Sequence, residues 1–573
     1  MRTVKARGGR GVQHEYVRLV ENCWEKGRRR QKVVANLGRK DVLAPHLDSL
    51  VRILGGEGNA GEWVRVGDVA HREVSGWGSL CVARALWREL GLEATLDRLG
   101  GRGGSGQWAS LADRAFVLVA YRLCQPGSEH GLAGWLETDY VCDRQGKRWV
   151  PPWEEHGRVQ VNLTWLQRWY RTLDELLKHK EEVEKDLYFG LRDLFSLEVE
   201  MVFYDLTSTY FEGEGPKGLA KHGYSRDGKP RNRQVLVGVV MVNGWPIAHH
   251  IFPGNVPDAQ TVKGVLEDLE RRFGLRRVVF VGDRGMVTTD NLAWLRQRGH
   301  GYLVGLQRRR REEIYRLIQS AQGPWQECPK PPGNKVDSPK TWVQEVAGEE
   351  PGVRVFVAMS QERLEYERGM REASMERTRV ALEGLAKRVA QGMLRVPEKI
   401  GAAAARILSR NHGQRYYGWK LEVGEFRYFE HPNLEREKAY EGKYLIQTEE
   451  KGLGPVEAVQ AYKDLSQVER AFRELKDVIE MRPIYHRNAD RVRGHIFVAA
   501  LAFLLERAME KKLKASGLGL SPREALGALQ TVHVVETEMG PQLKVGVNGG
   551  SGRARQVLAA LGITKLDPPQ QQA

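Results

Sequence analysis

The sequence has few cysteines for its length, and none of them are close together. Its 573 residues contain Cys23, Cys81, Cys124, Cys142 and Cys328, without a Cys-x-x-Cys pair. This spacing argues against a disulfide framework and against a cysteine zinc site, and it suits a reducing compartment.

Long apolar runs are also absent. The longest, "IFVAALAFLL" from Ile496 to Leu505, has ten residues and charged flanks, whereas a helix needs about 20 to cross a bilayer. Met1 opens a basic, glycine-rich stretch with no apolar segment of the secretory kind. We therefore expect a soluble cytoplasmic protein with no membrane partner and a buried helix at 496–505.

Acidic side chains are outnumbered, with 73 Asp and Glu against 89 Lys and Arg, which gives a net charge of +16. The first forty residues alone contain twelve basic and three acidic side chains. This clustering favours a polyanionic partner, nucleic acid before membrane, over a role in solubility alone.

The hydrophobic pattern changes several times along the chain and predicts an α/β catalytic core with additional regions. Paired β-capable runs around "EKGRRR" predict a basic hairpin near the N-terminus, and helical periodicity follows from Ser79. Strands then alternate with helices, and an Asn243-Gly244 turn joins two of the strands. The predicted regions are a β-rich module (1–75), a helical, DNA-binding domain (76–196), the core (197–306 and 441–515), an insertion (307–440) with a long helix at 361–408, and a C-terminal region (516–573).

Two aspartates follow buried β runs, Asp205 after "MVFY" and Asp283 after "VVFVG". Groups at the ends of strands in α/β sheets face the crevice where ligands bind. Glu469 lies on a helix expected to pack on the same sheet. Three carboxylates brought together need a cation, and ligation by oxygen alone favours Mg²⁺ or Mn²⁺ over zinc. Two such ions, about 3.5–4 Å apart, would serve phosphoryl transfer.

The stretch "YKDLSQVERAFRELK" places Tyr462, Glu469 and Lys476 seven residues apart, on one predicted stripe of a helix. Its apolar side is expected to be Val468, Phe472 and Leu475. In this interpretation, Tyr462 and Lys476 hold phosphates beside the metals. Each acid taken singly also has a plainer interpretation, because Asp after a strand is often a cap or turn former and a helical Glu is usually solvated.

These stretches, with "FYDLTSTYFEG", "FPGNVPDAQTV" and "VGDRGMVTTDNL", resemble bacterial insertion-sequence transposases of the DDE class, and most of all the IS-four-like group. The resemblance implies an RNase H-like core, a mixed sheet flanked by helices and interrupted by a β-rich insertion. It implies that Asp205, Asp283 and Glu469 are catalytic and bind two Mg²⁺ or Mn²⁺ ions. The implied reaction is cleavage at the element ends by metal-activated water, followed by direct attack of the freed 3′-OH on target DNA.

The implied partners are double-stranded DNA, at the element's terminal repeats and at the target, and a second copy of the chain. Because it binds DNA, the protein is expected to associate with the nucleoid. The group's signature has Arg between its Tyr and Glu, but this chain has Leu465 there. Lys463, Arg470 or Arg473 could supply the missing contact, and Arg473 is included among the DNA-binding residues. Some members of the group form a hairpin intermediate and flip a base onto an aromatic side chain, for which Trp294 and Trp325 are candidates by type alone, since most tryptophans are core residues.

Other signals are weaker. The adjacent His249 and His250 are expected on opposite sides of a strand, and His495 is expected to be a packing histidine on a helix edge. "GGRGG" from Gly100 is interpreted as a linker, and "QRRRREEI" as either a DNA-tracking or a solvated run. Two functions compete with transposition: a metal-dependent nuclease that cuts without joining, and a DNA-binding regulator with a decayed catalytic site.

Overall fold

The structure is a computed structural model. It describes residues 2–7, 13–25, 28–46, 69–100, 109–156, 163–193, 200–275, 277–286, 288–306, 312–329, 338–410, 412–539 and 542–569. The chain divides into two compact units. The first consists of residues 1–73 and 536–545, and the second of residues 74–535 and 546–573.

The first unit contains an antiparallel sheet in the order β1-β2-β3. Its strands are Arg2–Arg7, Gln13–Glu25 and Arg28–Arg39. Strands β2 and β3 pair from Tyr16 with Arg39 to Glu25 with Arg28, so the predicted hairpin is confirmed. A short helix α1 (Lys40–Leu43) and a 3₁₀ turn (Ala44–His46) follow. A separate sheet has the order β17-β16-β4, with strands Gln542–Val547, His533–Met539 and Val69–Gly76.

The second unit begins with helices, as the sequence pattern predicts. They are α3 (Gly78–Glu89), α4 (Leu92–Gly100), α5 (Leu111–Cys124), α6 (Leu132–Thr138), α7 (Pro152–His156), α8 (Leu163–Lys178) and α9 (Lys180–Asp193). Helix α17 (Ala489–Ala515) contains the apolar run at 496–505 and packs against α5 and α8. Its predicted burial is confirmed, because residues 496–499 and 501–505 are buried.

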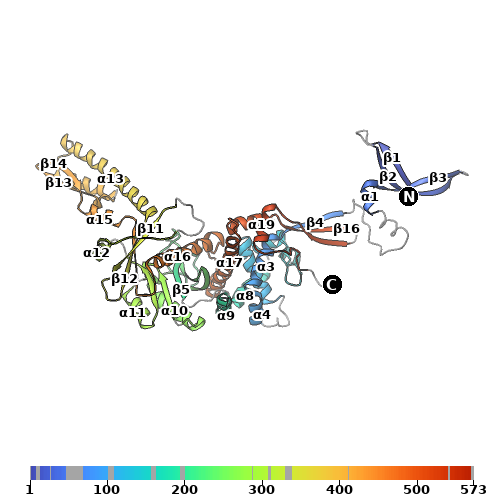
Figure 1. Ribbon diagram of the computed structural model, residues 1–573, viewed down its shortest axis with the longest axis horizontal. Coiled ribbons are helices and arrows are strands. Elements are labelled where there is room, and N and C mark those ends of the chain that lie inside the picture. The colour runs from blue at the N-terminus through green and yellow to red at the C-terminus, as the bar shows by residue number, and fades with distance from the viewer. Residues whose placement is uncertain are drawn as a thin grey trace. The chain divides into compact units, whose positions relative to one another are not determined.

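A nine-stranded sheet forms the core of the second unit, in the order β10-β11-β12-β15-β9-β8-β5-β6-β7. Strands β5, β11 and β12 of this sheet are labelled in Figure 1. Strands β5, β8 and β9 are parallel, and β5, β6 and β7 form an antiparallel meander. Their bounds are Glu200–Tyr210 (β5), Gln234–Val242 (β6), Trp245–Pro253 (β7), Val278–Gly282 (β8) and Gly301–Gly305 (β9). The prediction of a mixed sheet flanked by helices is confirmed.

The turn between β6 and β7 has the predicted chemistry. Asn243 and Gly244 both have positive φ, 50° and 73°, and Val242 pairs with Trp245 across them. Helices α10 (Asp258–Phe273) and α11 (Thr289–Gln297) connect the parallel strands. Helix α16 (Pro455–Arg473) contacts β5, β8 and β9. It starts with Pro455, after which the Glu457 carboxylate accepts from the Gly454 N–H at 3.0 Å.

The segment predicted as an insertion also contributes strands to this sheet. They are β10 (Gln326–Glu327), β11 (Thr341–Ala347) and β12 (Arg354–Ser360), and β12 pairs antiparallel with β15 (Lys443–Thr448). Strands β11 and β12 were predicted to lie outside the core, but their backbones continue its hydrogen-bonded ladder. Helix α12 (Glu312–Ser320) packs near β11.

The rest of this segment, residues 361–441, has an apolar cluster of its own around Leu382, Ile400 and Phe426. We refer to it as the arm. The prediction of one helix at 361–408 is wrong: α13 (Gln361–Ala390) ends before Gly392, which has φ 69°, and α14 (Pro397–Arg410) starts at a proline. A hairpin of β13 (Tyr417–Glu422) and β14 (Glu425–Glu430) and helix α15 (Asn433–Tyr440) complete the arm.

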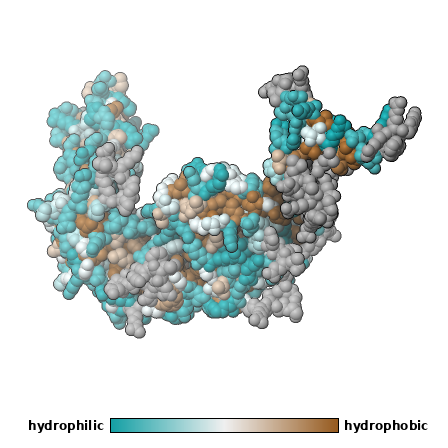
Figure 2. All heavy atoms as spheres, turned by 45° about the vertical axis from the view of Figure 1, so that its right-hand side comes forward, coloured by the Kyte–Doolittle hydropathy of each residue, from teal (hydrophilic) through white to brown (hydrophobic). Residues whose placement is uncertain are grey.

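Helices α18 (Pro522–Leu529) and α19 (Gly552–Ala560) pack together near the end of the chain. Among the described residues, no helix is both long and apolar enough to span a bilayer. The face drawn in Figure 2 is largely hydrophilic, as 28% charged residues would lead one to expect.

Candidate metal and nucleic-acid site

Asp205 and Asp283 lie at the same level along two neighbouring strands. Asp283 follows the last residue of β8, as predicted, but Asp205 lies in the middle of β5 and not at its end, because the strand continues to Tyr210 along β6. Strands β5 and β8 are parallel, and Phe203 pairs with Val281. Each aspartate is two residues beyond its member of that pair, so the ladder places them side by side where β8 ends. The strands form here because "MVFY" and "VVFVG" are apolar and rich in β-formers, and residues 278–282 are fully buried.

Each of the two carboxylates accepts a nearby backbone N–H. Asp205 Oδ1 accepts from Leu206 at 2.7 Å, and Asp283 Oδ1 accepts from Gly285 at 2.7 Å. A Cβ at residue 285 would be 3.1 Å from Asp283 Oδ1. The hydrogen bond from Gly285 closes a local turn, which is the role that the plainer interpretation gives to Asp283. The same bond also orients the carboxylate beside β5.

Glu469 comes to this edge of the sheet from helix α16, whose apolar side packs on β5 and β8. The predicted apolar residues Val468, Phe472 and Leu475 are all buried, and Glu469 is exposed. The three acids are not gathered closely enough for one oxygen of each to lie within 4.8 Å of the other two.

The charges of the three acids influence one another. The pKa of Asp205 is raised to about 7, mainly by burial and further by the negative charges of Asp283 and Glu469, while the Leu206 N–H and the Arg226 guanidinium oppose the rise. Near neutral pH, this carboxyl is therefore only partly ionised without a cation. A set of oxygen ligands with unbalanced negative charge is what a hard divalent ion such as Mg²⁺ or Mn²⁺ binds.

A second set of charged side chains lies at this site and was not predicted from the sequence. In the loop between β5 and β6, the Arg226 N–H donates to Ser208 Oγ at 2.8 Å, and its guanidinium pairs with Asp258 at 2.7 Å. The next residue, Asp227, has a side chain only 3% exposed and accepts from Lys476 Nζ at 2.7 Å. Asp227 also pairs with Arg482. The sequence signal was weak, because "YSRDGKPRNR" looks like any polar loop.

Tyr462 is half-buried over strand β9. Its ring stacks on Tyr444 with centroids 6.0 Å apart. Its hydroxyl lies so close to Gly305 that a Cβ there would be 2.2 Å from the Tyr462 oxygen. Glycine at residue 305 therefore allows the ring to lie over the strand end.

Lys476 is not on the regular stripe that its spacing predicts. The α-helix ends at Arg473, and residues Glu474–Val478 form a π turn, so the count of 3.6 residues per turn fails before Lys476. Lys476 is 9% exposed. Burial lowers its pKa, while the hydrogen bond to Asp227 opposes the decrease.

Leu465, at the position where the resembling group has Arg, is a core residue with 5% exposure. Two of the side chains considered as substitutes have internal partners. Lys463 donates to Thr341 Oγ1 at 2.8 Å, and Arg470 pairs with Glu510 at 2.8 Å. Arg473 is exposed on the last turn of α16.

Both tryptophan candidates are partly buried against apolar clusters. Trp294 packs on the main core and has the Arg298 guanidinium 5.2 Å from its ring centroid, and Trp325 packs on the cluster around Ile314. "GGRGG" beyond Gly100 and the arginines of "QRRRREEI" lie outside the described residues.

His249 and His250 bind different acids. His249 Nδ1 lies 2.9 Å from a Glu184 oxygen, and His250 Nε2 lies 3.6 Å from Asp268. His495 is buried, as expected of a packing histidine, and lies within reach of Glu129 and His486.

Residues 201–505 match the family described as "Transposase DDE domain", and residues 1–60 match the N-terminal domain of IS1634 family transposases. No curated protein matches the chain. One solved structure, a Mos1 transposase paired-end complex with a left transposon end, matches with 14% identity and a TM-score of 0.14. The match covers 35% of this chain and 61% of that one, less than two thirds of its length.

The N-terminal match is to the IS1634 family, so the finer assignment to the IS-four-like group is not confirmed. The DDE domain match covers more than half of the chain and includes Asp205, Asp283 and Glu469. The chain thus belongs to the DDE transposase family of insertion sequences.

Proposed function

We propose that the protein is a transposase that cleaves DNA at the ends of an insertion sequence and joins the freed 3′-OH to target DNA. The observation that supports this most is the level placement of Asp205 and Asp283 on adjacent parallel strands, with Glu469 close enough to raise the pKa of Asp205. The three acids come from segments far apart in the sequence.

The proposed metal ligands are Asp205, Asp283 and Glu469, and their oxygen-only chemistry fits Mg²⁺ or Mn²⁺. When bound, such ions supply Lewis acidity at a phosphodiester. The protein's own part is to hold three carboxylates in place. Strand pairing and the Gly285 N–H position the aspartates, and core packing of α16 positions Glu469.

In the joining step that we propose, the 3′-oxygen of the element bonds to a target phosphorus, and the target's own 3′-oxygen leaves. One phosphodiester is made for each one broken, so no energy source or covalent protein–DNA bond is needed. The chain must position both DNA strands for this exchange.

Tyr462, Lys476 and Arg473 are the proposed DNA contacts. Arg473 is exposed. Lys476 is paired with Asp227 and would have to share its ammonium between that acid and a phosphate. The basic residues of the N-terminal region, which contains the IS1634-type domain, are proposed to bind the element ends.

Two element ends must be held together for transposition, so we propose that a homodimer forms on DNA and that the protein associates with the nucleoid. The motif order still allows the IS-four-like group, while the N-terminal match favours the IS1634 family. A hairpin intermediate remains a prediction of the resemblance.

The test uses the inverted repeats expected to flank the coding sequence. Purified full-length protein is incubated with linear DNA ending in these repeats, a supercoiled target plasmid and Mg²⁺. We expect nicked or cut ends and a joined product that forms with Mg²⁺ or Mn²⁺ but not with EDTA.

Other outcomes would identify the competing functions. Cutting without any joined product would show a nuclease, and specific binding to the repeats without cutting would show a regulator. Either result would contradict the proposal.

A further inference from the structure

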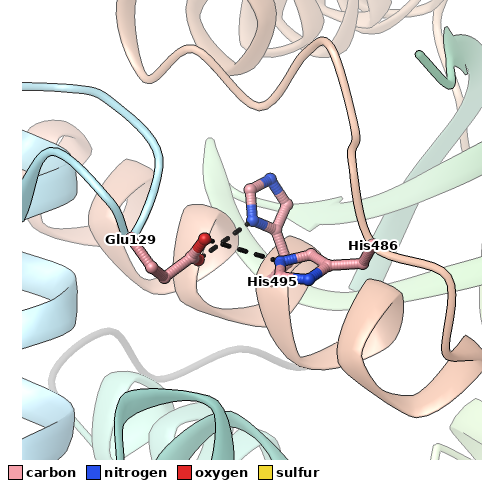
Figure 3. Close-up of side chains that lie close together, drawn as sticks. All are labelled: Glu129, His486 and His495. Carbon is pink, nitrogen blue, oxygen red and sulfur yellow. Dashed lines mark hydrogen bonds and ion pairs between the residues drawn. The ribbon is translucent and has the colours of Figure 1, made fainter. Parts of the chain in front are cut away.

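A second group of metal-type side chains lies apart from the acids of the sheet edge. It contains Glu129, from the segment between α5 and α6, His486, from the segment before α17, and His495, on α17. One ligand atom from each lies within 4.8 Å of the other two, and no other described His, Cys, Asp or Glu forms such a group. Figure 3 shows the Glu129 carboxylate pointing at both imidazoles.

The two distances between Glu129 and the imidazoles are longer than those of most charge-assisted hydrogen bonds and fit ligand atoms around one ion. Glu129 Oε1 is 3.3 Å from His495 Nδ1, and Oε2 is 3.5 Å from His486 Nε2. Charge-assisted N–H···O bonds are usually about 2.7–2.9 Å long. Ligand atoms bound tetrahedrally to zinc at about 2.0–2.2 Å are about 3.4 Å from one another.

His495 has the tautomer that a ligand needs. Its Nε2 is 3.2 Å from the Met481 carbonyl oxygen, which can only accept, so the ring proton is on Nε2. Nδ1 then has its lone pair on the side of Glu129, where it accepts from the Arg122 guanidinium at 3.3 Å. A second nitrogen that donates to a backbone carbonyl is the usual arrangement behind a metal-binding imidazole.

Glu129 also lies beside a cation of the protein, the Arg122 guanidinium. Arg122 lies 3.6 Å from Glu129 Oε1 and donates to the Glu480 carbonyl at 3.2 Å. When a cation takes the His495 lone pair, Arg122 still has the carboxylate as a partner.

The group opens onto a cavity of about 540 Å³. Its lining includes Ser128, His130, Tyr170 and Tyr485 beside the three side chains. A fourth ligand position therefore has room for water or for a small anion.

We propose that Glu129, His486 and His495 bind a divalent transition metal, zinc in the first place, at a site separate from that of the three acids. Two imidazoles and one carboxylate select such a metal over Mg²⁺, which prefers oxygen ligands. The bound metal ties the chain before α17 to the loop that follows α5. This proposal does not rest on the proposed function, because it concerns other residues and needs no DNA.

The experiment measures the metal content of the full-length chain with Asp205→Asn, so that the acids of the sheet edge contribute less. The protein is stripped with a chelator, exposed to zinc in excess Mg²⁺, desalted and analysed by mass spectrometry. We expect about one zinc per chain. Cobalt in place of zinc should give visible absorption bands typical of nitrogen and oxygen ligands.

Glu129→Gln and His486→Gln, which keep side-chain size and hydrogen bonding, should each lower zinc binding by at least about tenfold. The matched control is His249→Gln, an equally buried histidine paired with a glutamate but without a second imidazole ligand. It should bind zinc like the parent, and its circular dichroism gives the reference for folded protein.

The proposal is overturned if the parent takes up no zinc, if the Gln variants bind as much as the parent while folded, or if His249→Gln loses zinc to the same extent. Loss confined to the ligand variants supports it. None of these outcomes depends on DNA cleavage, so failure here leaves the proposed function to its own test.

Discussion

Asp205 and Asp227 are both largely removed from solvent and lie on connected segments, but their charges are balanced differently. Asp227 has the Lys476 ammonium at 2.7 Å and the Arg482 guanidinium beside it. Asp205 accepts one backbone N–H. The Arg226 guanidinium lowers the pKa of Asp205, but it is itself paired with Asp258. One acid is neutralised by the protein, and the other is left with two further acids as neighbours.

The difference shows which acids serve the fold. A buried acid with cationic partners stabilises the fold only as long as those partners stay. A buried acid without them destabilises the fold when it is ionised, so its presence needs another reason. We infer that Asp205 is retained for a ligand and Asp227 for structure.

The largest expected effect is on Asp205. Asp205→Asn should lower DNA cleavage in Mg²⁺ by at least about 10³-fold, because a neutral amide is a poor ligand for a hard cation. The free energy of unfolding at pH 8 should stay the same or increase, since the lost charge is unfavourable. End cleavage and urea unfolding measure the two effects. Asp290→Asn, at an exposed acid of α11, is the control and should cleave normally. Normal cleavage by Asp205→Asn would contradict the inference that Asp205 is retained for a ligand.

Adding a cation to α16 tests whether charge balance alone matters. Leu465→Arg should lower the free energy of unfolding by about 4 kcal/mol, because the side chain at this position is buried in the core. Chemical denaturation measures it, with Leu465→Met as a control expected to cost less than about 1.5 kcal/mol. A stable Leu465→Arg protein would mean that the helix can turn this position toward the acids.

Removal of the balanced acid should act in the opposite direction to removal of Asp205. Asp227→Asn leaves Lys476 and Arg482 without their carboxylate and should cost about 3 kcal/mol of unfolding free energy. The control is Glu214→Gln, which breaks the exposed pair with Arg233 and should cost less than about 1 kcal/mol. If Asp227→Asn and Glu214→Gln changed the free energy of unfolding equally, the distinction between Asp205 and Asp227 would be lost.

The smallest effect is expected for a substitution of Glu506 on α17. This acid also lacks a balancing charge, but it lies away from the site. Burial, with the nearby Glu474 charge, raises its pKa to about 8, and its Oε2 has no hydrogen-bond partner among the described residues. The folded chain thus keeps a proton here that the unfolded chain releases near pH 4.5. Stability should fall as the pH rises from about 4.5 to about 8.

Glu506→Gln cannot ionise, so it should lose this part of the pH dependence and gain on the order of 2 kcal/mol over the parent at pH 9. Thermal unfolding at pH 5 and pH 9 measures the change. A parallel decline in parent and variant would show that Glu506 is not the group responsible.

Sequence patterns predict the parts of the site that depend on local structure. Apolar runs before Asp205 and Asp283 define strands, and the i, i+4 spacing of Val468 and Phe472 places both in the core. The parallel register that sets the two aspartates level follows from the fold class. The strands and the buried helix face need only near neighbours in the chain.

Pairings across long stretches could not be predicted. Lys476 and Asp227 are 249 residues apart, and Glu129 and His495 are 366 apart. The π turn after Arg473 has no mark in the sequence, so the position of Lys476 was extrapolated from an α-helix. Strands β11 and β12 were separated from the core because a break in the alternation of strands and helices precedes them, although they pair within it.

The arm leaves and re-enters the sheet at neighbouring points. Met359 near the end of β12 pairs with Lys443 at the start of β15. Topologically, residues 361–441 are therefore the connection of one β-hairpin, enlarged to a subdomain with its own core. The two strand ends would tolerate a tight turn in their place, so this region could be exchanged or lost in the course of evolution without unravelling the sheet that positions the acids.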